Sequence, residues 1–225
     1  MTDMTKPITL QQFREAEGVG DWRLLSEGAC AYFRTVSFAA GAGLVQAIGE
    51  LDGLGDHHPD VDLRYDGVTV RLITVTADHY GMSERDVALA RQISALAREQ
   101  GLSADPSVVQ TMLVIPGAPN IADVMPFWRA VLGYEARPDS PDEDLVDPRG
   151  FGPAFWFEQM EEPRPGGSGA IHVAVWVPDE EAEARVAAAL AAGGRMVRDD
   201  FAPAWWTLAD AAGNEADIAT TTGRD

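Results

Sequence analysis

The amino-acid sequence predicts an α+β protein of two domains. The N-terminal domain is expected to be an antiparallel four-stranded sheet with helices on one face. The C-terminal domain is expected to be a duplicated unit of one strand, one helix and three strands (βαβββ). Two observations support this prediction: the order of helix-like and strand-like segments over residues 8–101, and a pattern that occurs twice after residue 107. The expected domains are residues 1–103 and 107–225.

The first elements of the N-terminal domain alternate between helix and strand patterns. "TLQQFREAE" is a short helix pattern that Thr9 caps, and "WRLLSEGACAYFRTVSF" alternates like strands around a turn at Gly28. "AAGAGLVQAIGELDGL" has apolar residues at helical spacing. "VDLRYDGVTVRLITVT" predicts two strands joined at Asp66-Gly67, a pair typical of tight hairpins. This order of elements indicates an antiparallel sheet.

The last helix of this domain, Met82–Gln100, has the clearest sequence pattern. Ser83 is expected to cap it, with Asp86 three residues later as in a capping box. An apolar stripe follows, and Gly101 ends the helix. The run "GLSADPS" then predicts a linker, because Ser, Asp and Pro cluster there between two periodic segments.

The C-terminal domain is predicted from an internal duplication. Residues 107–160 and 169–220 each read as a strand, a helix and then strands around a turn. The turns match, because Asp147 and Gly150 in the first copy correspond to Asp210 and Gly213 in the second. The duplication therefore predicts the fold more specifically than either copy does alone.

The composition limits the classes of function. The 225-residue chain is 46% apolar, enough for a sizeable core, and its formal net charge is −19. A surface this acidic repels phosphate backbones and anionic membranes, so neither nucleic acid nor a membrane is expected as a partner. No apolar run approaches the length of a membrane span, and we find no signal peptide. Cys30 is the only cysteine, which excludes an intrachain disulfide and a thiolate metal cluster and favours a cytoplasmic location.

The run "GDHHPDVDLRY" places two of the four histidines, His57 and His58, side by side. Imidazole is the side chain whose ordinary pKa lies nearest to neutral, so the pair is a candidate for giving and taking a proton. A solvated polar turn is the alternative reading. The combination of "HHP", the aromatic residue Tyr65 and the helix start "GMSERD" resembles the pterin-4a-carbinolamine dehydratase family, over roughly residues 8–100.

The resemblance implies a lyase that removes water from a 4a-hydroxytetrahydropterin, such as 4a-hydroxytetrahydrobiopterin, to give the quinonoid dihydropterin. It implies three catalytic histidines and no metal, and His57 and His58 align with the family's pair. The third position departs from the family, because spacing from the flanking motifs gives Val75 or Ala77. His79 is expected to supply the missing imidazole, with a solvated loop position as the alternative. The resemblance also implies substrate binding by five residues: Asp56, Pro59, Thr76, Asp78 and Asp86.

Residues 107–220 resemble the vicinal oxygen chelate superfamily, which includes glyoxalase-like and extradiol dioxygenase-like proteins. "FWRAVLGYE" in the first copy and "LADAAGNEADIA" in the second carry this resemblance. It implies two half-sheets around a cleft, where many members hold a divalent metal. Transferring the ligand positions gives Gln110, His172 and Asp217, with Ala154, which cannot bind a metal, at the fourth. A metal is therefore not favoured and no other cofactor is expected; if a metal is bound, these three donors hold it.

Three functions stay open on the sequence alone. The first is the lyase, acting on a pterin or another aromatic heterocycle. The second is a non-catalytic binder of an aromatic small molecule. Its evidence is a set of aromatic residues whose other explanation is core packing: Phe155, Trp156, Phe157, Trp176, Trp205 and Trp206. The third is a glyoxalase-like or dioxygenase-like metalloenzyme acting through the C-terminal cleft. The dehydratase family forms dimers and tetramers, so a homodimer is a further expectation.

Overall fold

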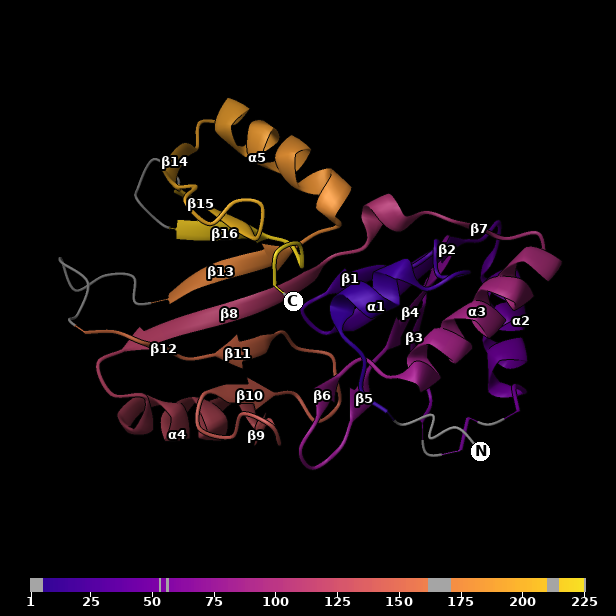
Figure 1. The fold of residues 1–225 in the computed structure, drawn as a ribbon, viewed down its shortest axis with the longest axis horizontal. Helices are drawn as coiled ribbons and strands as arrows, with labels where there is room; N and C mark the ends of the chain where they lie inside the picture. Colours follow the sequence, from indigo (N-terminus) through magenta and orange to yellow (C-terminus); the bar gives the residue numbers. More distant parts are fainter. Residues whose placement is uncertain (1–5, 53, 56, 162–170, 210–214, 225) are drawn as a thin grey trace. The chain divides into compact units, whose positions relative to one another are not determined.

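A computed structural model describes residues 6–52, 54–55, 57–161, 171–209 and 215–224 of the chain. The chain divides into two compact units, Met1–Val109 and Gln110–Arg224, which we call the N-terminal and C-terminal units (Figure 1). The predicted α+β fold class is confirmed in both.

The N-terminal unit is an antiparallel sheet with the strand order β1-β2-β4-β3. A short fifth strand, β7, pairs with β2. The strands are β1 (Arg23–Leu25), β2 (Gly28–Arg34), β3 (Asp60–Leu63), β4 (Gly67–Leu72) and β7 (Ser103–Ala104). The helices are α1 (Leu10–Glu15), α2 (Phe38–Gly49) and α3 (Glu84–Glu99), and a 3-10 turn, η1 (Pro106–Val108), follows β7. These elements include the four strands that the sequence predicts.

The helices pack on one face of this sheet because successive side chains of a strand point to opposite faces. Val68, Val70 and Leu72 of β4 lie in one hydrophobic core with Leu44 of α2 and Ile93 of α3. The alternate positions of β4 lie on the other face of the sheet, which is the polar one.

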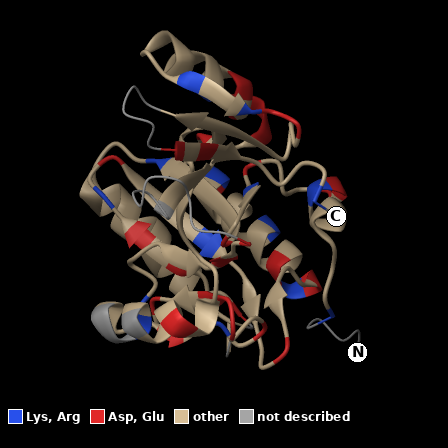
Figure 2. Ribbon diagram, turned by 90° about the vertical axis from the view of Figure 1, so that its left-hand side faces the viewer, with Lys and Arg blue, Asp and Glu red and all other residues tan. Residues whose placement is uncertain are grey.

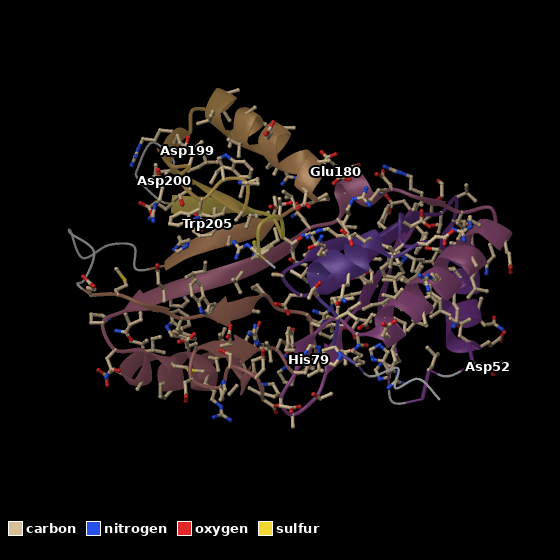
Figure 3. All side chains as sticks on the ribbon, in the orientation of Figure 1. Asp52, His79, Glu180, Asp199, Asp200 and Trp205 are labelled. Atoms are coloured by element: carbon tan, nitrogen blue, oxygen red, sulfur yellow. The ribbon has the colours of Figure 1, made fainter. Side chains whose placement is uncertain are left out.

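A small hairpin interrupts the path from β4 to α3. It consists of β5 (Thr74–Val75) and β6 (Tyr80–Gly81), which pair antiparallel. The sequence pattern places a single strand through this region, because two-residue strands leave no periodicity to detect. The turn of the hairpin carries His79 (Figure 3).

The C-terminal unit contains the predicted βαβββ pattern twice. The first copy is β8 (Thr111–Ala118), α4 (Ile121–Leu132), β9 (Glu135–Ala136), β10 (Asp144–Val146) and β11 (Ala154–Trp156), followed by the short β12 (Glu158–Gln159). The second copy is β13 (Ile171–Trp176), α5 (Ala182–Ala191), β14 (Arg195–Arg198), β15 (Trp205–Ala209) and β16 (Glu215–Ala219), with a 3-10 turn, η2 (Asp179–Glu181), before α5.

The sheet order shows the duplication directly. The strands follow the order β14-β15-β16-β13-β8-β11-β10-β9, with β12 also on β8. The first strand of each copy pairs in parallel with the last strand of that copy, and the two first strands, β8 and β13, pair antiparallel at the centre. Gly150 donates its backbone N–H to the carbonyl of Asp147 at 2.9 Å, which closes the predicted turn. The matching turn, Asp210 to Gly213, lies outside the described residues.

Each copy buries its own core on the helix side of the sheet. Val177 lies in a core with Val186 of α5, and Val175 packs against that core. The alternate residues of β13, His172, Ala174 and Trp176, therefore lie on the other sheet face.

The surface is strongly acidic, as the net charge of −19 requires. Figure 2 shows Asp and Glu spread over helices, strands and loops. Among the described residues, no helix has the length and apolar character needed to span a membrane.

Candidate histidine site

The candidate site begins at the start of α3. Ser83 caps this helix, and its backbone N–H donates to Oδ2 of Asp86 at 2.7 Å, which completes the predicted capping box. Both residues have exposed fractions of 0%. A carboxylate buried to this extent is stable only if hydrogen-bond donors surround it.

Two hydroxyl groups supply further contacts to Asp86. Thr74 Oγ1 lies 2.7 Å from Oδ2, and Ser83 Oγ lies 3.0 Å from the same oxygen. The two hydroxyl oxygens are also 2.7 Å apart. Two hydroxyl protons cannot serve three contacts at once, so one of these contacts is not a hydrogen bond at any given moment. Thr74 belongs to β5, so this network fixes the His79 hairpin to the start of α3.

The second oxygen of Asp86 contacts the histidine pair. Nε2 of His57 lies 2.9 Å from Oδ1 of Asp86, and the His57 side chain is 10% exposed. An ionised carboxylate only accepts hydrogen bonds, so Nε2 carries the proton and donates it to Asp86. In the neutral ring Nδ1 then keeps its lone pair. The contact thus selects the tautomer that can accept a proton at Nδ1.

The other predicted site residues occupy different environments. His58 is exposed and Pro59 is half-buried, directly after His57. Thr76 and Asp78 are exposed in the hairpin turn, where Thr76 Oγ1 donates to Oδ1 of Asp78 at 3.1 Å. The remaining predicted residue, Asp56, lies outside the described residues.

His79 is partly buried, and its ring packs on the backbone of the hairpin. A Cβ atom built on Gly81 would lie 3.1 Å from Cε1 of His79, so the ring lies directly against the Gly81 backbone. The backbone N–H of Thr76 donates to the His79 carbonyl at 2.8 Å. Nε2 of His79 is buried and has no hydrogen-bond partner among the described residues. A buried polar atom without a partner is rare in folded proteins, so this nitrogen marks His79 as a candidate site residue.

The three predicted metal donors of the C-terminal unit do not converge. Nε2 of His172 lies 3.3 Å from Oδ2 of Asp217, whose other oxygen accepts from Thr207 Oγ1 at 2.7 Å. Gln110, in contrast, precedes β8 and accepts a hydrogen bond from Arg185 at 3.2 Å.

The register of β8 and β13 places His172 opposite Ile115. Gln110 is therefore about 16 Å away along the strand, at about 3.3 Å per residue. The described residues contain no group of three or more His, Cys, Asp or Glu side chains with the geometry of a metal site. This donor set does not fit a divalent metal.

The aromatic residues of the C-terminal unit divide between the two cores and a group of rings near Arg224 and Phe201. Phe155 and Phe157 lie in the core of the first copy, and Trp206 packs against the core of the second. The Arg224 guanidinium lies 4.5 Å from the Trp176 ring and 5.0 Å from the Trp205 ring. The side chain labelled Trp205 in Figure 3 also stacks on Phe201 at 4.2 Å.

Comparison with known proteins identifies the N-terminal unit. The family model described as pterin 4 alpha carbinolamine dehydratase matches residues 6–96. A protein of Mycobacterium leprae, provisionally named a pterin-4-alpha-carbinolamine dehydratase, is 36% identical over 78 residues, which cover 35% of this chain and 81% of the relative. A protein of Aquifex aeolicus with the same provisional name is 33% identical over 86 residues, which cover 38% and 85%. The chain belongs to the pterin-4-alpha-carbinolamine dehydratase family.

The C-terminal unit carries a second domain. The family model described as glyoxalase-like domain matches residues 112–219. A solved structure of a glyoxalase/bleomycin resistance protein/dioxygenase superfamily member from Vibrio splendidus is 19% identical, with a TM-score of 0.33, and the match covers 50% of this chain and 99% of that chain. The chain is thus a dehydratase-family domain followed by a glyoxalase-like domain.

Sequence reasoning missed the partners of the predicted residues. Thr74 has no motif that marks it, and the contact between His57 and Asp86 joins positions 29 residues apart. The capping box marked Ser83 and Asp86 as a helix start, and the resemblance marked Asp86 as a substrate-binding residue, but neither indicated its contact with His57. The polar neighbours of the hairpin, Glu27 and Arg71, had no signal in the sequence.

Proposed function

We propose that the N-terminal unit dehydrates a 4a-hydroxytetrahydropterin by acid–base catalysis through His57, His58 and His79. The observation that supports this function best is the buried contact of His57 with Asp86 at 2.9 Å, next to His58 and within the region that the family model matches. Asp86 is fully buried, so in this proposal it acts through His57 and does not touch the substrate.

The reaction needs two proton transfers. The proton on N5 of the pterin leaves, the N5 electron pair forms the C4a=N5 double bond, and the C4a–O bond breaks. The hydroxyl takes up a proton and leaves as water. One group must therefore accept a proton while another delivers one, which suits imidazoles near neutral pH.

The roles follow from the protonation states that the contacts favour. His57 has its proton held at Nε2 by Asp86, so Nδ1 is the atom that accepts the N5 proton. His79 is assigned the delivery of a proton to the leaving hydroxyl, because its buried Nε2 has no partner among the described residues. The exposed His58 is assigned to contact the edge of the pterin or to exchange protons with water.

The test is the rate of dehydration of freshly generated 4a-hydroxytetrahydropterin, compared with the uncatalysed rate. We expect His57→Ala to lower kcat/KM by about 10²- to 10⁴-fold, the range for loss of a general acid or base. His172→Ala is the matched control, because it removes a histidine from the other unit. The assignment is refuted if the wild-type protein accelerates dehydration and His57→Ala accelerates it equally.

A second candidate is the binding of an aromatic small molecule by the C-terminal unit. One observation favours it: Nε1 of Trp176 is buried and has no acceptor within the described part of the chain. Trp156, on the first copy's last strand, is also 37% exposed. An indole N–H of this kind can donate to a carbonyl or ring nitrogen of a planar ligand.

Tryptophan fluorescence tests this second candidate with oxidised pterin as the probe. We expect saturable quenching in the wild-type protein and weaker binding in Trp176→Phe, which keeps an aromatic ring but removes the donor. Trp22→Phe is the control, because Nε1 of Trp22 already donates to Ser94 at 3.0 Å within the N-terminal core. Equal quenching in both variants, or none in the wild type, would exclude this binding mode.

A further inference from the structure

A chain of polar side chains links the two histidine-bearing segments of the N-terminal unit. Neither the motifs of the sequence nor the predicted site residues include it. Asp60 lies two residues after His58, and Tyr80 directly follows His79. Two further side chains connect these ends, so that the order of contact is Tyr80, Glu27, Arg71 and Asp60.

The contacts form a continuous path. The Tyr80 hydroxyl donates to Oε2 of Glu27 at 2.5 Å. The same oxygen lies 3.6 Å from Nη1 of Arg71. Arg71 in turn donates from Nε and Nη2 to Oδ2 of Asp60, at 3.0 and 2.6 Å. One guanidinium therefore bridges two carboxylates, one from the turn between β1 and β2 and one from the first residue of β3.

The path is anchored in the sheet. Arg71 lies on β4 directly opposite Asp60 of β3 on one side and opposite Cys30 of β2 on the other. Glu27 occupies the two-residue turn before Gly28. Arg71 and Asp60 are thus held by the sheet, and Glu27 lies in the turn at its edge. Asp60 begins β3 two residues after His58, and Tyr80 begins β6 directly after His79.

Burial distinguishes the contact between Arg71 and Glu27 at the centre of this path from an ordinary surface ion pair, whereas the Asp60 side chain at its end is 59% exposed. The side chains of Arg71 and Glu27 are 24% and 13% exposed. The Arg64–Asp62 pair, on the same β3–β4 hairpin, is 74% and 50% exposed. Water screens the exposed pair more strongly, so it contributes little to fixing a geometry. Burial lowers the pKa of Arg71. The hydrogen bonds and charge of Asp60, together with the charges of Tyr80 and Glu27, outweigh this effect, so the pKa is raised overall.

We propose that Arg71 and Glu27 are positioning residues, which hold the His57–His58 segment and the His79 hairpin in a fixed relation to each other. The proposal rests on the proposed dehydratase function. Asp86 already joins these segments through His57 and Thr74. A hairpin attached at one point can still rotate about that point, and a second, independent attachment prevents this rotation. Misplacement of a catalytic group by about 1 Å is enough to lower a rate about 100-fold.

Kinetics of matched variants test the proposal. We expect Arg71→Ala and Tyr80→Phe to lower kcat for dehydration by about 10-fold or more, with a smaller change in KM. The midpoints of the pH–rate profile stay in place, because the contact between His57 and Asp86 is intact. Arg64→Ala and Tyr65→Phe are the controls for residue type, and both should stay within about 2-fold of wild type, as expected for an exposed pair and an exposed ring.

A double variant separates positioning from general destabilisation. If Tyr80 and Arg71 act through one path, the variant with both substitutions loses no more kcat than Arg71→Ala alone. Independent structural damage instead gives losses that multiply. Multiplied losses that follow the loss of thermal stability would overturn the proposal.

A readout without turnover distinguishes failure of this proposal from failure of the lyase function. The NMR signal of the His79 ring should shift or broaden in Arg71→Ala and Tyr80→Phe, while that of His172 in the other unit stays constant. If the wild-type protein does not accelerate dehydration, the lyase function fails, and the His79 signal still tests the link. An unchanged His79 signal together with unchanged kcat would overturn the positioning role. Should Arg71→Ala fail to fold, Tyr80→Phe, which removes a single hydroxyl, decides the question.

Discussion

Asp86 connects helix formation to the proposed chemistry within one side chain. Oδ2 accepts from the backbone of Ser83 and contacts two hydroxyls, and Oδ1 contacts His57. The donors around Oδ2 hold the Asp86 carboxylate in one orientation, and its Oδ1 then holds the His57 imidazole in one orientation. A helix-capping residue at this place therefore sets the tautomer of a histidine that is distant in the sequence.

We predict that Asp86→Asn lowers both stability and activity. An amide has one acceptor oxygen, so its N–H group faces either the backbone N–H of Ser83, where two donors oppose each other, or His57 Nε2, which must then lose its proton and accept. Unfolding free energy should fall by about 1–3 kcal/mol, the usual penalty for an unsatisfied buried group. The dehydration kcat should fall by about 100-fold or more, because the wrong His57 tautomer is favoured. Chemical denaturation and steady-state kinetics measure the two effects.

Ser83→Ala is the control for Asp86→Asn. It removes a hydroxyl that contacts Oδ2 but leaves Oδ1 with His57. Stability should therefore fall while kcat changes by only a few-fold. Equal loss of kcat in the two variants would show that the activity follows the helix start in general and not the orientation of His57.

At the scale of elements, segments with a strong local sequence pattern were predicted correctly, whereas segments without such a pattern were not. The capping box at Ser83 and the apolar stripe of α3 are confirmed. The hairpin predicted at Asp66-Gly67 forms, but Arg64 pairs with Gly67, so its two-residue loop is Tyr65-Asp66 and Gly67 begins β4. The β5–β6 hairpin has two residues in each strand, too few for any period to appear. Its position depends on long-range contacts, such as that between Tyr80 and Glu27, 53 residues apart.

The β1–β2 hairpin supports the positioning path through Gly28. This residue has a φ of +106°, in the region that favours glycine. A Cβ atom there would lie 2.2 Å from the backbone oxygen of Leu72, closer than atoms can approach. We predict that Gly28→Ala lowers the unfolding free energy by more than about 2 kcal/mol, since backbone strain and the collision add. Denaturant titration measures this change.

Gly20→Ala is the matched control for Gly28→Ala. A Cβ atom at Gly20 meets nothing within 4 Å, and its φ is not in the left-handed region. Its stability should stay the same or rise slightly, because alanine reduces the freedom of the unfolded chain. If Gly28→Ala is as stable as Gly20→Ala, then Gly28 does not lie against the backbone of Leu72 at the end of β4.

At the scale of the whole molecule, the repeated pattern predicted the architecture better than it predicted individual donors. A duplication fixes the order of strands, since each copy must supply the same half of the sheet, and the strand order confirms it. A metal ligand depends in addition on where one side chain points. Gln110 shares the aligned position but lies before β8 and contacts Arg185. Alignment alone does not reveal such a difference.

The pH dependence of stability offers a prediction for the whole chain, because two aspartates of one strand–turn–strand segment, the buried Asp144 and the half-buried Asp147, should act with opposite sign. Burial raises the pKa of Asp144, with Ser140 and Arg137 opposing this effect. Backbone N–H groups of Arg149, Gly152 and Phe151 lower the pKa of Asp147. A raised pKa contributes stability below the ordinary value, and this contribution is lost as the pH rises through the folded pKa. A lowered pKa contributes stability above the ordinary value, and this contribution is lost as the pH falls through the folded pKa.

Asparagine variants isolate these two contributions from the general repulsion of an acidic chain. Asparagine resembles a protonated aspartate, so Asp144→Asn should match wild type near about pH 4 and become the more stable protein as the pH rises to about 7. Asp147→Asn should be less stable than wild type over that whole range, because the lowered pKa keeps its carboxylate charged throughout. Denaturant titrations at several pH values measure both differences. A stability difference for Asp144→Asn that shrinks as the pH rises would contradict the burial of a charge at this position, since net-charge effects are nearly the same in the two variants.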